Sequence, residues 1–409
     1  MKVNRVERHL IKKSDSMWKT IDDYCLISKN VYNEANYLIR QEFFKNGKWI
    51  RHRDLDKVMQ HYDCYKMLGS QASQNLLRLL DKNWKSFFIA IKDWSKKNGV
   101  GYLGKPVPPK YKEKINGRNI LMIKNIQCKI INSTIYFSWK PLNKFSGIKT
   151  RVNGKLQQIR FIPSGNCYWM EIVYETNVPD INKDANRIIG IDLGINNFAT
   201  IANNTDLKSI VIKGGVIKSM NRYYNKEKSR IQKETGMVWN NRLRNLTDKH
   251  MRKLDYFMHI TSKFVVDYCL TNNIDTIIIG KNNEWKQYVN MGHVNNQNFV
   301  CIPFNKFIDK VKYKCENVGI NFIANEENFT SGTSFLDGEL PIKENYNIKR
   351  RINRGLFESN NNIKINADLN ASYQIIKKVF PNAFNDKGNR GCDLHPVAIK
   401  IQQMGLKTQ

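Results

Sequence analysis

Apolar and polar residues in the first quarter of the chain alternate with the period of an α-helix. Apolar side chains recur at steps of three and four residues from Leu77 to Ile91, which is the spacing of one buried helix face. Residues from about Ser16 to Asn98 are therefore expected to be helical. Lys82 and Lys85 lie between the apolar positions, and we expect them on a basic face that points to solvent.

A segment rich in Gly and Pro, residues 101–112, ends this pattern because both residues disfavour a continued helix. Residues 119–178 then contain short runs with the period-two alternation of half-buried strands, and Asn132-Ser133 is expected to form a hairpin turn between two of them. A strand-like stretch also opens the chain. We expect these strands to form a small antiparallel sheet or β-barrel, with the helical region inserted after the first strand.

The pattern changes again after residues 177–182, which have the character of a linker. Residues 187–330 alternate strand-like and helical patterns, and one more helix is expected over 363–380. The expected strands are 188–193, 198–202, 209–213, 276–279 and 321–324, and the expected helices are 218–233, 240–271 and 305–317. This order predicts a mixed α/β sheet. Residues 382–409 show no pattern that predicts a helix or strand, and we expect them to form a mobile tail.

The charge of the chain indicates a polyanionic partner. Its 409 residues include 67 Lys and Arg against 36 Asp and Glu, which gives a net charge of +31. Cations placed near phosphates release condensed counterions, so nucleic acid is the first candidate and an anionic membrane surface the second. The sequence has no run of about 18 apolar residues and no apolar signal-peptide core, which argues against a membrane and for a cytoplasmic, nucleoid-associated protein.

Two segments carry candidate metal-binding carboxylates. Asp192 shares one face of an expected strand with Ile188 and Gly190, and it stands just before Gly194, which permits a sharp turn. Asp368 falls in the first turn of an expected helix, where the helix dipole favours an anion. Taken alone, each aspartate could be no more than a turn or helix cap.

Together, these two segments resemble the first and third catalytic motifs of RuvC-type nucleases. The version of these motifs that the chain resembles is the one found in transposon-encoded TnpB proteins, which are related to type V CRISPR effectors and eukaryotic Fanzor proteins. The resemblance covers most of the chain: residues 74–88 resemble the TnpB helical segment, 104–112 its basic loop, and 296–300 with Thr330-Ser331 its later landmarks.

The resemblance implies an α/β multidomain fold. A small antiparallel β-barrel with an inserted helical subdomain would precede a RuvC, ribonuclease H-like nuclease domain with a mixed sheet. The implied boundaries are 1–15 with 101–180 for a wedge-type barrel, 16–100 for a helical recognition domain, 186–330 with 363–380 for the RuvC domain, 331–362 for an insert that binds target nucleic acid, and 381–409 for a C-terminal tail.

The resemblance also implies an RNA-guided DNA endonuclease that supports transposon maintenance. Its partners would be a guide RNA derived from the transposon end and a double-stranded DNA target, which pair into an RNA–DNA heteroduplex beside a short target-adjacent motif. Its catalytic site would hydrolyse phosphodiesters with two Mg²⁺ or Mn²⁺ ions.

The chain departs from the family at the second catalytic motif. Most TnpB proteins carry a glutamate at the end of a central strand, where this chain has Gly280. Two aspartates alone would bind a divalent cation poorly. Because an adjacent strand lies only about 5 Å away, we expect Glu327 to replace the missing acid, as in some eukaryotic relatives. Glu284, Glu326 and the absence of a functional glutamate are the alternatives.

A second departure is the insert. Many family members hold a four-cysteine zinc ribbon between the positions of Thr330 and Asp368, but this chain has no cysteine there, and its eight cysteines include no Cys-x-x-Cys pair. We therefore expect neither zinc nor disulfides. The insert is basic, so it either contacts nucleic acid or is a solvated loop; the candidate contacts are Lys349, Arg350, Arg351 and Arg354.

Two basic surfaces are expected to bind the guide RNA, because structured RNA is gripped through its backbone and exposed rings can stack on unpaired bases. The candidate residues are Lys82 and Lys85 of the helical region and Lys105, Lys110, Tyr111, Lys112 and Lys114 of the loop.

Two other interpretations stay open. Residues 189–194 also resemble the phosphate loop of actin-like ATPases and sugar kinases, although neither a second Asp-Gly-Gly loop nor a glycine-rich adenosine site is found. The other alternative is a nuclease-dead, RNA-guided DNA-binding repressor. Gly280 favours it, and the retention of both aspartates disfavours it.

Overall fold

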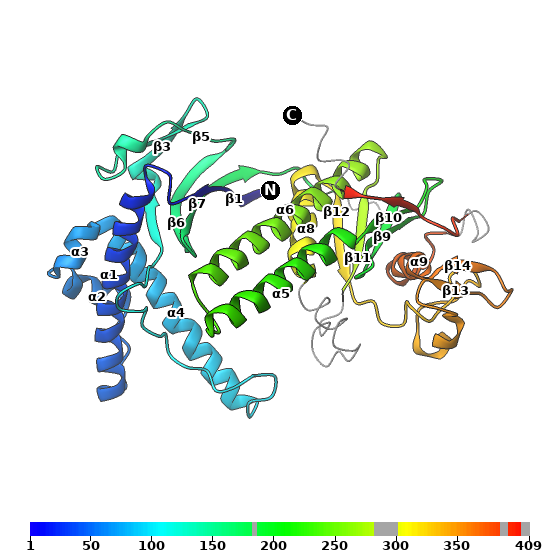
Figure 1. Ribbon diagram of the computed structural model, residues 1–409, viewed down its shortest axis with the longest axis horizontal. Helices are drawn as coiled ribbons and strands as arrows, with labels where there is room; N and C mark the ends of the chain where they lie inside the picture. Colours follow the sequence, from blue (N-terminus) through cyan, green and yellow to red (C-terminus); the bar gives the residue numbers. More distant parts are fainter. Residues whose placement is uncertain (182–185, 282–301, 385–391, 402–409) are drawn as a thin grey trace. The chain divides into compact units, whose positions relative to one another are not determined.

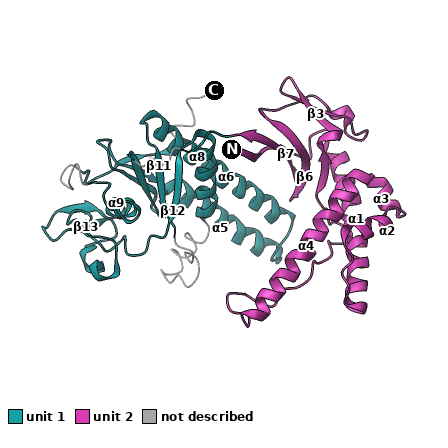
Figure 2. Ribbon diagram, turned by 180° about the vertical axis from the view of Figure 1, so that it is seen from behind, with its two compact units in different colours: residues 1, 178–409 teal, residues 2–177 magenta. Residues whose placement is uncertain are grey.

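The computed structural model describes residues 1–181, 186–281, 302–384 and 392–401 (Figure 1). The chain divides into two compact units, residues 2–177 and residue 1 with 178–409, which Figure 2 colours separately. Each unit has buried apolar clusters of its own. Of the described helices, none is long and apolar enough to cross a membrane.

Four helices occupy the region of the first unit that the sequence predicted to be helical. They are α1 (Trp18–Asn46), α2 (His52–Met59), α3 (Asp63–Leu68) and α4 (Ser70–Lys96). The apolar stripe of α4 is its buried face, and Leu77, Leu80 and Trp84 are almost completely buried. The Trp84 indole donates a hydrogen bond to Asn36 Oδ1 of α1 (3.0 Å), which links the two long helices.

The strands of this unit form two antiparallel sheets. The order of one is β1 (Lys2–Ile11), β7 (Cys167–Asn177), β6 (Lys155–Ser164) and β2 (Leu121–Lys124), and that of the other is β3 (Cys128–Ile131), β4 (Thr134–Phe137) and β5 (Ile148–Lys149). Asn132 and Ser133 both have positive φ between β3 and β4, 47° and 55°, which confirms the predicted hairpin turn.

The expected β-barrel is not seen. Residues 2–177 are all described, and in them β1 and β2 are edge strands that do not pair with each other, so the sheet stays open. Alternation of apolar and polar residues predicts which face of a strand is buried, whereas closure depends on strand tilt and stagger, which the alternation does not encode.

The second unit is built on a mixed six-stranded sheet, as the sequence predicted. Its order is β12 (Asn321–Asn325), β11 (Thr276–Gly280), β8 (Ile188–Leu193), β9 (Asn197–Asn203), β10 (Ile210–Lys213) and β15 (Val397–Ile399). Strands β8, β11 and β12 are parallel, so their carboxyl ends meet at one edge. Strand β15 lies where no element was expected, because three residues are too few to show a period.

Helices pack on both faces of this sheet. They are α5 (Gly215–Thr235), α6 (Asn241–Thr271), α8 (Phe304–Val318) and α9 (Ala367–Val379). Ile189 and Ile191 of β8 share a buried cluster with α6 and α8, whereas Ile188 shares one with α9. Asp192, with the same parity as Ile188, therefore belongs to the α9 face.

The predicted helix over 363–380 begins only at Ala367, because a short hairpin precedes it. This hairpin pairs β13 (Leu356–Glu358) with β14 (Lys364–Asn366). The cysteine-free segment before α9 is anchored by aromatic packing. Phe335 is fully buried, stacks on Tyr373 of α9 at 4.4 Å between ring centroids, and meets Phe384 edge-on at 4.7 Å.

Candidate functional site

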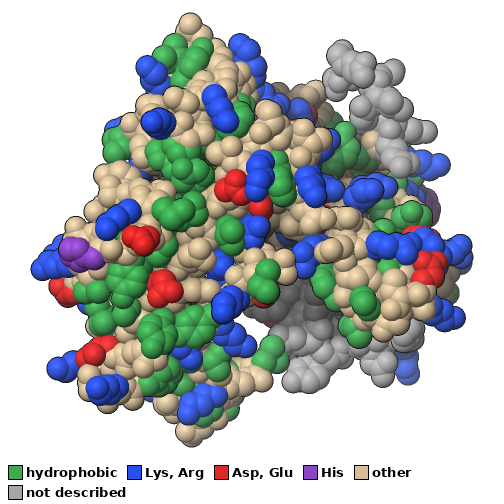
Figure 3. All heavy atoms as spheres, turned by 60° about the vertical axis from the view of Figure 1, so that its left-hand side comes forward, with side chains coloured by type: hydrophobic (Ala, Val, Ile, Leu, Met, Phe, Trp, Pro, Cys, Tyr) green, Lys and Arg blue, Asp and Glu red, His purple; other side chains and the backbone are tan. Residues whose placement is uncertain are grey.

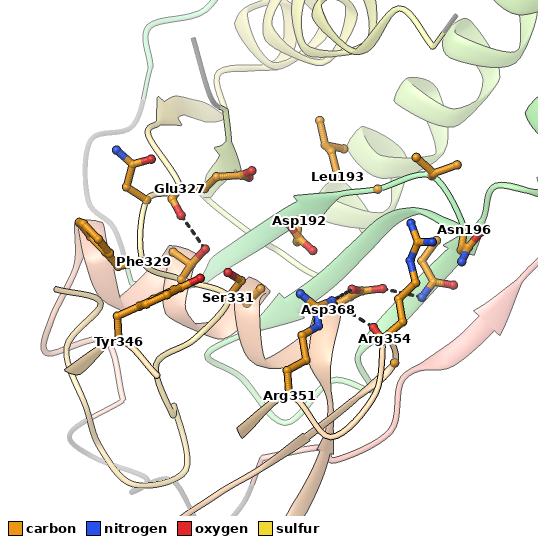
Figure 4. A pocket seen from close by; sticks show the side chains of 17 residues that line it. Asp192, Leu193, Asn196, Glu327, Phe329, Ser331, Tyr346, Arg351, Arg354 and Asp368 are labelled. Carbon is orange, nitrogen blue, oxygen red and sulfur yellow. Dashed lines mark hydrogen bonds and ion pairs between the residues drawn. The ribbon is translucent and has the colours of Figure 1, made fainter. Parts of the chain in front are cut away.

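A pocket of about 740 Å³ lies at the edge where β8 and β12 end (Figure 4). Asp192, Glu327 and Asp368 all line it. Asp192 is near the end of β8, Glu327 follows the last residue of β12 by two positions, and Asp368 is the second residue of α9. The structure thus brings together, from three separate elements, the three acids that the sequence analysis selected.

Gly280 explains how Glu327 reaches this place. It ends β11, the strand between β8 and β12. A Cβ atom built on Gly280 would lie 2.6 Å from Oε2 and 3.2 Å from Cβ of Glu327. The Glu327 side chain therefore fills the space that a side chain at residue 280 would need.

A second glycine allows the close approach of α9 to β8. A Cβ atom on Gly190 would overlap the carbonyl oxygen of Ser372 and lie 2.6 Å from Cγ1 of Ile376. The Ser372 hydroxyl also donates a hydrogen bond to the carbonyl oxygen of Thr200 in β9 (2.9 Å). These contacts hold the first turn of α9, which carries Asp368, beside the end of β8.

Hydrogen bonds orient the Asp368 carboxylate. Asn366 caps α9, and its Oδ1 accepts from the amides of Asp368 (3.1 Å) and Leu369 (3.0 Å). Oδ2 of Asp368 accepts from Asn197 Nδ2 (2.7 Å), and Oδ1 accepts from the Arg351 guanidinium (3.2 Å). Such partners fix which oxygen of a carboxylate faces a ligand.

Asn197 is a functional candidate that the sequence analysis missed. Its Oδ1 accepts a hydrogen bond from Lys213 Nζ (3.0 Å), so the amide is held while its nitrogen donates to Asp368. The only signal in the sequence was its position, just after the Gly194 turn.

The environment of Asp192 disfavours its charged form. Burial raises its pKa well above the usual value, and the nearby Glu327 and Asp368 carboxylates raise this pKa further, while Arg351 lowers it. The side chain keeps some exposed surface, yet closely packed protein surrounds it. The Glu327 and Asp368 carboxylates therefore repel a charged Asp192.

The donor set fits a hard divalent cation, because Mg²⁺ and Mn²⁺ prefer carboxylate oxygens and a cation would relieve the repulsion at Asp192. Asp192, Glu327 and Asp368 would hold it. Within the described ranges, no three His, Cys, Asp or Glu side chains are close enough together to form a metal cluster. The Arg351 guanidinium also bonds Asp368 (3.2 Å).

The four basic residues predicted to contact nucleic acid in the insert lie in different environments. Arg351 and Arg354 line the pocket. The Arg350 guanidinium instead donates to both carboxylate oxygens of Glu339, each at 2.8 Å. Lys349 is exposed and is not among the residues that line the pocket.

The predicted basic loop of the first unit is bound to α1 through its backbone. Tyr32 Oη donates to the carbonyl oxygen of Lys110 (3.2 Å), and Asn33 Nδ2 donates to that of Lys112 (3.0 Å). These hydrogen bonds use the backbone of the loop, so its side chains stay exposed to solvent. The exposed candidate residues are Lys105, Lys110, Tyr111, Lys112 and Lys114 of the loop, and Lys82 and Lys85 of α4. Figure 3 shows Lys and Arg side chains spread over one face of the molecule, with few acidic side chains among them.

The other residues that the sequence analysis named differ in whether they line the pocket. Thr330 and Ser331 line the pocket. Glu326 is exposed and is not a lining residue. Glu284 and residues 296–300 lie outside the described residues.

Two protein-family models match the chain. Residues 171–286 match OrfB_IS605, described as a probable transposase, and residues 304–375 match the Cas12f1-like TNB domain. A curated relative, the TnpB-like protein ORF457 of the Acidianus two-tailed virus, is 22% identical over 400 residues, which covers 88% of this chain and 83% of the relative.

Two solved structures also align with most of the chain. A Cas12f1–sgRNA–target DNA complex shares 17% identity at a TM-score of 0.38 and covers 91% of this chain and 98% of its own. The mini-RNA-guided endonuclease CRISPR-Cas_phi3 shares 9% identity at a TM-score of 0.49 and covers 97% and 94%.

Proposed function

This chain belongs to the TnpB family, and on that basis we propose that it is an RNA-guided DNA endonuclease. One observation carries the proposal. Three acids that are far apart in the sequence, Asp192, Glu327 and Asp368, line a single pocket at the edge of a mixed sheet. A glycine at residue 280 leaves room for the acid that replaces the usual one.

In the proposed reaction, Asp192, Glu327 and Asp368 would hold two Mg²⁺ or Mn²⁺ ions. Such ions, when bound, activate water and stabilise the charge that develops on the leaving oxygen. Asn197 keeps the Asp368 carboxylate in one orientation. Arg351 and Arg354, whose guanidinium groups can bind phosphate oxygens in pairs, neutralise and position the DNA backbone.

The proposed partners are a guide RNA from the transposon end and a matching DNA duplex beside a short motif. The net charge of +31 supplies salt-dependent affinity for both. The lysines of α4 and the loop of residues 105–114 are the proposed guide-binding surface, and the insert of residues 331–362 is proposed to bind target nucleic acid. The cleavage would support maintenance of the transposon.

The proposed division of labour follows the boundaries given above. Residues 1–15 with 101–180 and residues 16–100 would hold the guide, and residues 186–330 with 363–380 would cut the DNA.

The test is purification of the full-length protein, identification of any RNA bound to it, and cleavage of a duplex that matches this RNA. We expect a discrete RNA and cutting that requires Mg²⁺ or Mn²⁺. Asp192→Ala and Asp368→Ala should bind the duplex and leave it intact.

Bound but uncut DNA with the wild-type complex would instead favour the repressor. ATP turnover without nucleic acid would favour the actin-like alternative.

A further inference from the structure

Two aromatic rings form part of the rim of the same pocket. Phe329 and Tyr346 both line it, and their centroids are 5.8 Å apart at an interplanar angle of 73°, an edge-to-face pair. In Figure 4 they lie across the pocket from Arg351 and Arg354. The pocket therefore has an aromatic side and a cationic side, and Asp368 lies on the cationic side, where it bonds Arg351.

Neither ring is a core residue. Phe329 is 36% exposed and Tyr346 39% exposed. In an edge-to-face pair, one ring covers at most one face of the other. Both residues therefore keep surface that a ligand can contact.

The backbone holds both rings firmly at the rim. Phe329 has a φ of 69°, a conformation that side chains with a Cβ rarely adopt. The Thr330 hydroxyl bonds the carbonyl oxygen of Glu327 (2.8 Å), and the Thr333 hydroxyl bonds that of Phe329 (2.9 Å), which fixes this turn. The turn that raises Phe329 to the rim is therefore the one that carries Glu327.

Tyr346 is held just as closely. A Cβ atom at Gly332 would lie 2.5 Å from Cε2 of Tyr346, so the ring rests directly on that glycine. The amide of Asn347 donates to the carbonyl oxygen of Gly332 (2.9 Å). The ring is thus in place before any ligand binds.

We propose that Phe329 and Tyr346 stack an unpaired nucleobase next to the phosphodiester that the site cuts. A base inside a duplex has both faces covered by its neighbours, whereas an unpaired base gains a partner from an open ring. The arginines hold the phosphates of the same strand on the opposite side. The pocket therefore takes the unpaired DNA strand, and the rings select it. This inference rests on the proposed function.

The test uses photo-crosslinking in the Asp192→Ala variant, loaded with its own RNA and a matching duplex. The cut is first mapped with the wild type. A single 5-iododeoxyuridine, which cross-links to an aromatic ring that it contacts, then replaces each nucleotide beside the cut in turn. We expect one of these positions to cross-link to Phe329 or Tyr346, as read by mass spectrometry.

The variants separate stacking from folding. Phe329→Gly removes the ring and suits the positive φ, so the fold should hold while the Phe329 cross-link disappears. In the otherwise wild-type enzyme, Phe329→Gly and Tyr346→Ala should each slow cleavage by about tenfold or more, and Phe329→Trp should restore it. Tyr256→Ala, at a ring that is 64% exposed on α6, is the matched control and should cut at the wild-type rate.

An abasic site at the cross-linking position should slow the wild type as much as Phe329→Gly does, and the two changes together should add nothing further.

Cross-links that form only to other residues, or that persist without the rings, would overturn the inference, as would wild-type cleavage by Phe329→Gly. In all three cases a cutting wild type leaves the proposed function intact. A wild type that cannot cut matched DNA would instead refute the proposed function, and the inference with it.

Discussion

The Glu327 carboxylate lies where a side chain at Gly280 would have to be, with Oε2 2.6 Å from an ideal Cβ position on that glycine. Gly280 ends β11, and Glu327 lies two residues past the end of the neighbouring parallel strand β12. One acid can therefore come from either strand but not from both at once, because the second side chain would have no space.

The first prediction concerns Gly280. Gly280→Ala places a methyl group against Glu327 Oε2 and Ile375 Cδ1, 2.6 and 2.7 Å from its ideal position, so Glu327 must move. Single-turnover cleavage should fall by on the order of 10- to 100-fold, the usual cost of disturbing the orientation of a metal ligand.

The matched test exchanges the two residues. Gly280→Glu with Glu327→Gly should cut faster than Gly280→Glu alone, since it returns one acid to the pocket and removes the clash. A Gly280→Ala variant that cuts at the wild-type rate would show that Glu327 does not need this space.

The second prediction concerns Asn197. Asn197→Ala removes the hydrogen bond to Asp368 Oδ2 and should slow cleavage by roughly 10- to 100-fold. Raising the Mg²⁺ concentration should recover part of this loss, because the remaining defect lies in holding the carboxylate. Lys213→Ala, one step further away, should have a smaller effect. If Asn197→Ala cut DNA at the wild-type rate, Asn197 would have no role in orienting Asp368 for cleavage.

The third prediction contrasts two adjacent arginines. Arg351 bonds Asp368, whereas Arg350 bonds Glu339. Arg351→Ala should abolish most cleavage and should lower the melting temperature less than Arg350→Ala does, because its ion pair is longer and more exposed. Arg350→Ala should lower the melting temperature, because a partly buried ion pair is broken, and should retain most cleavage. The reverse pattern, measured by single-turnover kinetics and thermal denaturation, would contradict this assignment.

The fourth prediction is a pH dependence. The folded protein raises the pKa of Asp192 above its usual value, so between those two values the folded state binds more protons than the unfolded state. Stability is therefore lost as pH rises through this window, and above it the cost of the charged group is complete. In metal-free buffer, Asp192→Asn should melt above wild type at pH 8, and the difference should vanish at pH 4.

Added Mg²⁺ should narrow the difference at pH 8, since a cation stabilises the charged carboxylate only in wild type. An Asp192→Asn variant that melts below wild type at both pH values would contradict the repulsion among the three acids.

The fifth prediction concerns the cysteine-free insert. Phe335 is fully buried against Tyr373 and Phe384, so Phe335→Ala should destabilise the protein by about 3–5 kcal/mol in chemical denaturation. Addition of a zinc chelator should not change the melting temperature. If the chelator lowered the melting temperature by more than Phe335→Ala does, a bound metal would be holding the insert together.

Part of the site was predictable from the sequence. The parity of β8 put Asp192 on one face and the N-terminus of α9 marked Asp368, but the resemblance to RuvC motifs selected these two acids, and the resemblance together with the spacing of adjacent strands gave Glu327 as the expected third. Asn197, Phe329 and Tyr346 were not predicted, since their roles depend on which segments meet in space. The prediction of a closed barrel was wrong for the same reason. Alternation of apolar and polar residues in β1 and β2 predicts which face is buried, but it does not predict whether these two edge strands pair with each other.

The most direct test of the account compares Glu327→Gln with Glu326→Gln in single-turnover cleavage of a guide-matched duplex. The two substitutions are chemically the same and one residue apart, but only Glu327 lines the pocket. The account predicts that Glu327→Gln binds the duplex and cuts it at least about 100-fold more slowly, while Glu326→Gln cuts like wild type. Full cleavage by Glu327→Gln would contradict it.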